Sequence, residues 1–260
     1  MNNVNKTMYI PLYGKALVSK KGIILKDKKA EEIWIKEGFK LKGKSKSKYL
    51  AYYMGIRSAV FDEWVLDKIK RNDNAVILHI GCGLDGRIYR VGFIKNTWYD
   101  VDFKEVLDAK KRYFIETDNY KMLEGNAIDC EFLSKTSNGS SAIVLLEGVS
   151  MYLNFTQLRS LFDKLSERFE NVSLLMDCYT DFAVKMSKYK NPVKDVGVSK
   201  VYGLNNPNLL NESGIKFIKE RQMTPNKYIN QLKGVEKFIF SKLYAGNISK
   251  KLYKLYEFKK

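Results

Sequence analysis

The sequence predicts an α/β protein: a doubly wound, mostly parallel sheet of seven strands with helices on both faces, an antiparallel last strand and an N-terminal helical extension. Three observations lead to this prediction. Five short apolar runs between residues 75 and 178 alternate with helix-like segments, glycines directly follow the first run, and two more strand-like segments lie near the C-terminus. A chain of 260 residues, 45% of them hydrophobic, is long enough to bury such a core.

The first 48 residues form a basic extension in front of the main domain, residues 49–260, and we expect this extension to act as a lid. One helix is expected in it, over Lys29–Gly38, followed by the charged, flexible segment Lys40–Lys48. Apolar residues then recur at helical spacing over Tyr49–Ile69, which predicts a helix or a pair of helices.

The central apolar runs predict parallel strands, because continuous apolar sequence suits a strand that is buried on both faces. The expected strands are Ala75–Ile80, Thr97–Asp102, Lys121–Glu124, Ser141–Leu146 and Asn171–Cys178. The expected helices are Asp85–Ile94, Phe103–Phe114 and Thr156–Phe169, the last with Thr156 as N-cap. After a loop over Tyr189–Asn211, the segments Ile215–Arg221 and Leu252–Lys259 read as strands, and the alternating pattern of the second predicts antiparallel pairing.

Basic residues are concentrated at the two ends of the chain. The formal charge is +17, but residues 1–50 carry +9, residues 51–180 carry −3 and residues 181–260 carry +11. An excess of this size is compatible with a nucleic-acid partner. However, 38 of the 46 basic residues are lysine, whereas bidentate recognition of phosphate and guanine favours arginine.

Cysteine and histidine are too few for a zinc site. The three cysteines show no CxxC spacing and the chain has one histidine, so we expect three free thiols and no metal. No signal peptide and no apolar run of about 20 residues is evident, which predicts a soluble cytoplasmic protein without a membrane partner.

The most informative segment is Leu78–Arg90, in which a strand runs into Gly81-Cys82-Gly83 and a helix follows. Glycines allow a tight turn close to a ligand, and the start of the helix presents free N–H groups. In a doubly wound sheet this junction lies at the carboxyl ends of the strands, where ligands bind. Asp102 ends the next strand and can accept hydrogen bonds from both ribose hydroxyls of an adenosine.

Two adenosine cofactors fit this motif. Gly81, Gly83, Gly86 and Asp102 satisfy the pattern of an NAD-dependent oxidoreductase. The motif nevertheless lies far into the chain, after a helical segment, and Asp85 places a negative charge where a pyrophosphate would bind. An acid near the glycines suits S-adenosylmethionine, which carries an amino group and a sulfonium but no phosphate.

Several blocks, in the same order along roughly residues 49–180, closely resemble the leucine carboxyl methyltransferase family, which includes the polyketide carboxyl O-methyltransferases. The blocks are Gly55–Leu66, Ile77–Arg90, Trp98–Lys110, Gly125–Asp129 and Leu146–Leu153. The resemblance implies a Rossmann-like methyltransferase fold, S-adenosylmethionine as cofactor and O-methyltransferase activity.

The resemblance also implies roles for single residues. The implied cofactor-binding residues are Arg57, Gly81, Cys82, Gly83, Asp102, Asp129, Cys130 and Glu147. Arg57 would hold the methionyl carboxylate, and Asp102 would bind the ribose hydroxyls. Asp129, with Cys130 beside it, would accept from the adenine amino group, and Glu147 would face the amino or methyl end. The matching residues Asp85, Arg87 and Arg90 would mainly pair with one another and stabilise the loop.

A carboxylate fits best as methyl acceptor, because it is ionised at neutral pH and needs no general base. The one histidine, His79, lies in a buried strand and is expected to be a core residue, so no catalytic residue is assigned. Tyr152, after the fourth strand, is a candidate for contact with the acceptor. The basic ends would attract an anionic small molecule. An NAD-dependent oxidoreductase and a non-enzymatic nucleic-acid-binding protein are the alternatives.

Overall fold

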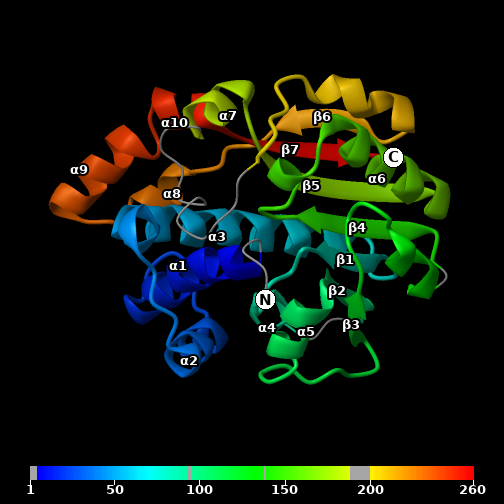
Figure 1. Ribbon diagram of the computed structural model, residues 1–260, viewed down its shortest axis with the longest axis horizontal. Coiled ribbons are helices and arrows are strands. Elements are labelled where there is room, and N and C mark those ends of the chain that lie inside the picture. Colours follow the sequence, from blue (N-terminus) through cyan, green and yellow to red (C-terminus); the bar gives the residue numbers. More distant parts are fainter. Residues whose placement is uncertain (1–4, 93–94, 138, 188–199) are drawn as a thin grey trace.

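The computed structural model describes residues 5–92, 95–137, 139–187 and 200–260. In these residues seven strands form one sheet, in the order β3-β2-β1-β4-β5-β7-β6 (Figure 1). The strands are β1 (Val76–Ile80), β2 (Trp98–Asp102), β3 (Tyr120–Glu124), β4 (Ser141–Leu146), β5 (Asn171–Tyr179), β6 (Lys216–Glu220) and β7 (Tyr253–Lys259). The first five pair in parallel, whereas β7 runs antiparallel to both β5 and β6. The predicted sheet, with its antiparallel last strand, is confirmed.

The two faces of the sheet have separate cores, because successive side chains of a strand point to opposite faces. Ile77 and Ile143 pack on the face that is covered by α3 (Lys48–Arg71), together with α4 (Arg87–Val91) and α5 (Lys104–Lys110). The opposite face, covered by α6 (Phe155–Arg168), takes the alternate side chains of the same strands. The expected helices are thus present, with α4 and α5 shorter than predicted.

The N-terminal extension contains two helices where one was expected. α2 (Lys28–Glu37) matches the predicted helix, but α1 (Tyr9–Lys20) was missed because Pro11 and Gly14 interrupt its pattern. Gly14 is needed for packing: a Cβ there would lie 2.6 Å from the Cβ of Met54 on α3. The extension is therefore packed closely against the main domain along α3.

Two other local expectations can be compared with the structure. Tyr49–Ile69 was expected to form a helix or a pair of helices, and it lies in one continuous helix, α3. Helix α6 is capped by Asn154, whose side chain accepts from the Gln157 N–H while the Gln157 side chain accepts from the Asn154 N–H. This reciprocal pair places the N-cap at Asn154, before Thr156, so the Thr156 prediction is wrong.

The C-terminal region returns to the N-terminal helices. Between β6 and β7 lie α8 (Asn226–Ile229), α9 (Gly234–Leu243) and α10 (Asn247–Leu252), while α7 (Asp181–Ser187) follows β5. Glu236 of α9 accepts hydrogen bonds from Lys48 and Tyr52 of α3. In the loop expected over Tyr189–Asn211, residues 189–199 lie outside the described residues, and Pro207–Ser213 forms a 3-10 helix. No helix among the described residues combines the length and apolarity needed to cross a lipid bilayer.

Candidate active site

A cavity of about 810 Å³ lies at the carboxyl edge of the sheet. Residues at the ends of β1, β2 and β5 line it, as do the residues directly after β3 and β4 and Tyr253 at the start of the antiparallel strand β7. The volume is in the range of small-molecule sites, about 300–1,000 Å³. Ligand binding at this edge is the expected behaviour of a doubly wound sheet.

The glycine loop after β1 forms one wall of the cavity. Gly81 has a φ of +70°, and a Cβ there would lie 2.3 Å from Cγ2 of Val149. Gly83 also has a positive φ, +52°. The backbone conformation therefore requires glycine at both positions. At Gly81 the space beside Val149 also leaves no room for a side chain. Cys82 between them lies against the cavity as a buried, free thiol.

Asp102 ends β2 and lies beside this loop at the cavity wall. Its Oδ2 accepts from the Gly83 N–H at 2.7 Å, and its Oδ1 accepts from the Phe103 N–H at 2.8 Å. Burial raises the pKa of the carboxyl to about 6, although both N–H groups oppose the shift. A ligand that donates hydrogen bonds to Asp102 would favour its ionised form.

Lys110, which the sequence analysis did not identify, supports the glycine loop from behind. This fully buried side chain donates to the carbonyl oxygens of Asp85 at 2.7 Å and Gly83 at 3.2 Å, and its ammonium lies 2.8 Å from Asp100. Although burial opposes the charged form, Asp100 keeps the pKa of Lys110 above its usual value. Lys110 therefore holds two backbone carbonyls of the loop as a cation.

His79 is buried, as expected, but it has polar partners. Its Nδ1 lies 3.2 Å from Asp100 and its Nε2 lies 3.1 Å from Nη1 of Arg87. Burial lowers its pKa. The imidazole is thus neutral near pH 7, with Nε2 accepting from Arg87, and both ring nitrogens face protein groups.

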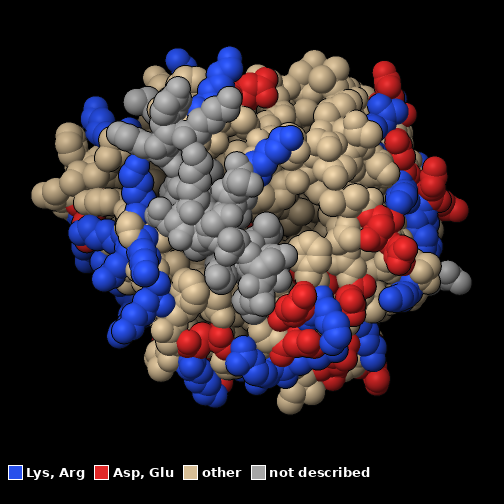
Figure 2. All heavy atoms as spheres, in the orientation of Figure 1, with Lys and Arg blue, Asp and Glu red and all other residues tan. Residues whose placement is uncertain are grey.

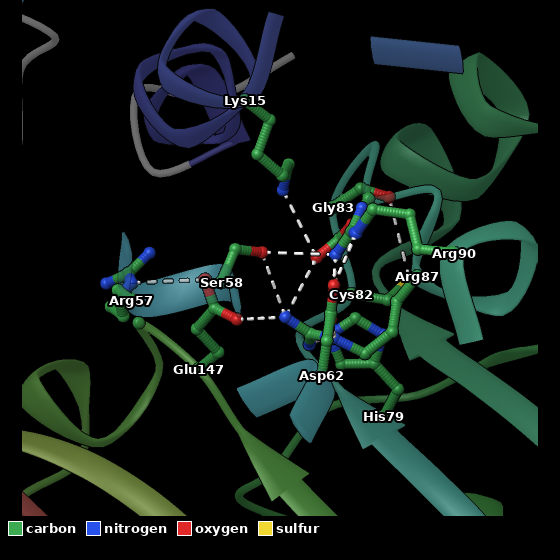
Figure 3. A network of polar contacts seen from close by, with 12 residues as sticks. Lys15, Arg57, Ser58, Asp62, His79, Cys82, Gly83, Arg87, Arg90 and Glu147 are labelled. Carbon is green, nitrogen blue, oxygen red and sulfur yellow. Dashed lines mark hydrogen bonds and ion pairs between the residues drawn. The ribbon is translucent and has the colours of Figure 1, made fainter. Parts of the chain in front are cut away.

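A buried network of ion pairs lies between the glycine loop and α3 (Figure 3). Asp85 lies 2.7 Å from Arg90 and 3.4 Å from Arg87, which confirms that these three residues pair and stabilise the loop. Glu147, just after β4, lies between Arg57 of α3 and Arg87 of α4. Burial would raise the pKa of Glu147, but the two arginines hold it at about 2.

The N-terminal extension contributes directly to this network. Lys15 of α1 points toward the glycine loop, and its Nζ lies 3.1 Å from Oδ2 of Asp85 (Figure 3). Lys15 lines the cavity, and Asp27, just before α2, forms a buried ion pair with Arg90. Lys15 and Asp27 could not be predicted as part of the site, since nothing near them in the sequence indicates a partner in α4 or the glycine loop.

The predicted adenine-binding residues occupy a turn next to the cavity. Gly125, Asn126 and the two residues after them line the cavity, whereas Asp129 and Cys130 are not among the lining residues. The Asp129 carboxylate accepts from the Asn126 side chain and from the Glu131 N–H. Cys130 is buried, with its thiol directed at the carbonyl of residue 127. Within this structure Asp129 thus stabilises the turn.

The end of the cavity away from the glycine loop is apolar and rich in aromatic side chains. Its lining includes Tyr53, Tyr152, Tyr179, Phe182, Met186 and Leu243. Burial raises the pKa of Tyr53, Tyr152 and Tyr179 above the usual value for tyrosine. Tyr152, predicted to contact the acceptor, is among these side chains.

Most of the basic residues lie outside the cavity. Among the described lining residues, Lys15 and Arg57 are the basic ones, and each is paired with buried acids. Figure 2 shows lysine and arginine side chains gathered along the left edge, where Figure 1 places α9 and the start of α3. Within the described parts of the two chain ends, the positive charge therefore lies mainly on the outer surface and not in the cavity.

Comparison with known proteins agrees with this geometry. The family model of leucine carboxyl methyltransferase matches residues 6–166. The tetracenomycin polyketide synthesis O-methyltransferase TcmP from Streptomyces glaucescens is 24% identical over 186 residues, 70% of this chain and 69% of TcmP. Neither comparison supports an NAD-dependent oxidoreductase or a nucleic-acid-binding protein.

Solved structures share the fold at low identity. A candidate methyltransferase from Thermobifida fusca YX superposes with a TM-score of 0.59 at 9% identity, covering 95% of this chain and 94% of the other. Magnesium protoporphyrin IX methyltransferase (ChlM) from Synechocystis PCC 6803, with bound S-adenosylhomocysteine, gives 0.50 at 9% identity, covering 90% and 95%. The match of the family model to more than half of the chain shows that this protein belongs to the leucine carboxyl methyltransferase family and is an S-adenosylmethionine-dependent methyltransferase.

Proposed function

We propose that this methyltransferase acts on the carboxylate of a small, largely apolar acceptor. S-adenosylmethionine, when bound, supplies an activated methyl group and a good leaving group. The protein then has to bind the two reactants, orient them and exclude water.

The glycine-loop end of the cavity fits the cofactor. The absence of side chains at Gly81 and Gly83 leaves backbone exposed to a ligand. Asp102 offers an acceptor for ribose hydroxyls, and Arg57 offers a guanidinium for the methionyl carboxylate. Glu147 lies on the same wall as Arg57 and would face the amino end of the cofactor.

Adenine would lie against the turn after β3. Because Asn126 and its neighbours line the cavity there, we propose that the backbone of this turn borders the base. Asp129 would act mainly by stabilising the turn through Asn126, and Cys130 by packing beneath it.

The protonated tyrosines at the opposite end are the observation that carries the proposal of a carboxylate acceptor. A phenol with the usual tyrosine pKa of about 10 is already protonated near neutral pH. Burial raises the pKa of Tyr53, Tyr152 and Tyr179 further. A phenol that keeps its proton can donate a hydrogen bond to an anionic oxygen, but it cannot remove a proton from a hydroxyl acceptor. This end of the site therefore suits an acceptor that arrives already ionised.

Apolar side chains in the cavity wall indicate that the acceptor molecule is largely apolar apart from its carboxylate. Phe182, Met186 and Leu243 line the cavity and are also partly exposed at the surface. A flat or aromatic acid would bury apolar area against them. The relative TcmP, whose name places it in polyketide synthesis, is consistent with such a body. The basic outer surface would attract the anion from solution, so acceptor KM should rise with ionic strength.

The experiment compares two acceptors that share one ring system. The enzyme is incubated with S-[methyl-³H]adenosylmethionine and either 2-naphthoic acid or 2-naphthol, and the products are treated with mild alkali. Methyl esters release volatile methanol under these conditions, whereas aryl methyl ethers do not. We expect alkali-labile label from the acid alone. Methylation of the naphthol in preference to the acid would overturn the proposal.

A further inference from the structure

The carboxylate of Asp177, near the end of β5, has no role in the site described so far. It is fully buried, with no exposed side-chain surface. Its Oδ2 lies 2.9 Å from Nη1 of Arg57, and its Oδ1 accepts from the Gly148 N–H at 2.6 Å. One carboxylate thus contacts both the arginine proposed to hold the cofactor and the backbone that follows Glu147.

We propose that Asp177 is a positioning residue for the cofactor: it orients the Arg57 guanidinium and fixes the Gly148 backbone, so that the arginine presents its remaining edge to the methionyl carboxylate. The proposal rests on the role assigned to Arg57 above. A guanidinium has five N–H donors in a rigid plane, so fixing some of them fixes the direction of the rest.

The contacts of Arg57 show which nitrogen of its guanidinium remains available to a ligand. Its Nε donates to Glu147 at 3.1 Å, and its Nη1 contacts both Asp177 and, at 3.2 Å, the hydroxyl of Tyr253. None of the described residues accepts a hydrogen bond from Nη2. Residues at the ends of β4, β5 and β7 thus hold the Nε and Nη1 groups, and Nη2 is the group available to a ligand.

Gly148 lies directly beside the Arg57 guanidinium and limits the space around it. Its φ is +73°, and a Cβ at this position would lie 3.3 Å from Nη1 and 3.4 Å from Nη2 of Arg57. Any side chain at Gly148 would therefore press on the guanidinium. The hydrogen bond from Gly148 to Asp177 holds the backbone at this separation, so the aspartate sets both the arginine and the space beside it.

Asp177→Asn is the sharpest variant, because it keeps the shape of the side chain. An Asn oxygen can still accept from Gly148, but the Asn amide then faces Nη1 of Arg57, placing a donor against a donor. We expect the Kd of S-adenosylhomocysteine to rise roughly tenfold, which is the effect of losing one charge-assisted hydrogen bond from the positioning of Arg57. Tyr253→Phe, which removes one hydroxyl from Nη1, should raise this Kd by a smaller factor.

Glu257→Gln is the matched control. Glu257 lies on β7 and is almost fully buried, but its main partners are Lys68 at 2.8 Å and Arg221 at 2.8 Å, and neither of these lines the cavity. This variant should lower the melting temperature, as the loss of a buried ion pair does, and leave the Kd of S-adenosylhomocysteine unchanged.

The measurement is isothermal titration with S-adenosylhomocysteine and with 5′-methylthioadenosine, which lacks the amino-acid part of the cofactor. For Asp177→Asn we expect weaker binding of S-adenosylhomocysteine and unchanged binding of 5′-methylthioadenosine. Equal weakening of both ligands, or no weakening of either, would overturn the proposal. If this variant does not fold, unchanged S-adenosylhomocysteine binding by Tyr253→Phe would overturn it. Failure of the wild-type protein to bind S-adenosylhomocysteine would instead refute the cofactor roles proposed above.

Discussion

Replacement of Asp102 by Asn should increase the free energy of unfolding of the ligand-free protein and at the same time weaken cofactor binding. Burial raises the pKa of Asp102 from 3.8 to about 6 in the ligand-free protein. The unfolded chain therefore loses this proton at lower pH than the folded chain does, so stability falls as pH rises from about 4 to 6. At 1.36 kcal/mol per pKa unit, the ionised carboxylate costs the folded state at most about 3 kcal/mol at neutral pH.

The affinity for the cofactor should depend on pH in the opposite direction from the stability. Ribose hydroxyls would donate to the ionised carboxylate, so the affinity for S-adenosylhomocysteine should increase with pH until Asp102 is fully ionised. With a pKa of about 6, binding by the wild-type protein should be roughly tenfold weaker at pH 5 than at pH 8. The neutral side chain of Asp102→Asn cannot titrate, so its affinity should be low and independent of pH over this range.

Two assays test the pair of effects. Urea unfolding of the ligand-free protein at pH 7.5 should show Asp102→Asn to be more stable than the wild type, by less than about 3 kcal/mol because one Asn group faces a backbone N–H. Isothermal titration between pH 5 and 8 gives the affinities, with Asp129→Asn as a control that keeps the wild-type pH profile. A wild-type Kd that is constant over this range, or a variant less stable than the wild type, would refute the reasoning.

Two further substitutions and one thiol-labelling experiment have definite expected outcomes. Gly81→Ala should reduce S-adenosylhomocysteine affinity at least tenfold in titration calorimetry, because its Cβ would meet Val149 at 2.3 Å; affinity within twofold of wild type would contradict this. Asn154→Ala, which removes the capping pair with Gln157, should lower the free energy of unfolding by about 0.5–2 kcal/mol in urea without changing affinity. The three free cysteines are buried, and burial raises the pKa of the Cys82 thiol well above its usual value, so Ellman's reagent should react only after unfolding; rapid labelling of the folded protein would show that at least one thiol is accessible.

The sheet could be predicted because its strands are encoded by neighbouring residues. Ser141–Leu146 was predicted with the bounds that the structure shows, since a parallel strand buried on both faces needs a continuous apolar run. Helix α1 could not be predicted in this way. Its packing depends on Gly14 and on the facing surface of α3, whose Met54 belongs to a separate segment later in the chain.

The residues of the site also fall into those encoded by neighbouring positions in the chain and those brought together from distant segments. The positions of Gly81 and Asp102 follow from a strand, a tight turn and the next strand, which are consecutive in the chain, so the sequence by itself determined the glycine loop, its neighbouring acid and the family. Only the tertiary structure decided that Lys15 of α1, Lys110 of α5 and Asp177 of β5 support this site. Their partners come from other elements. Burial of a charge is tolerated only where opposite charges and hydrogen bonds meet it, and folding alone brings those groups together.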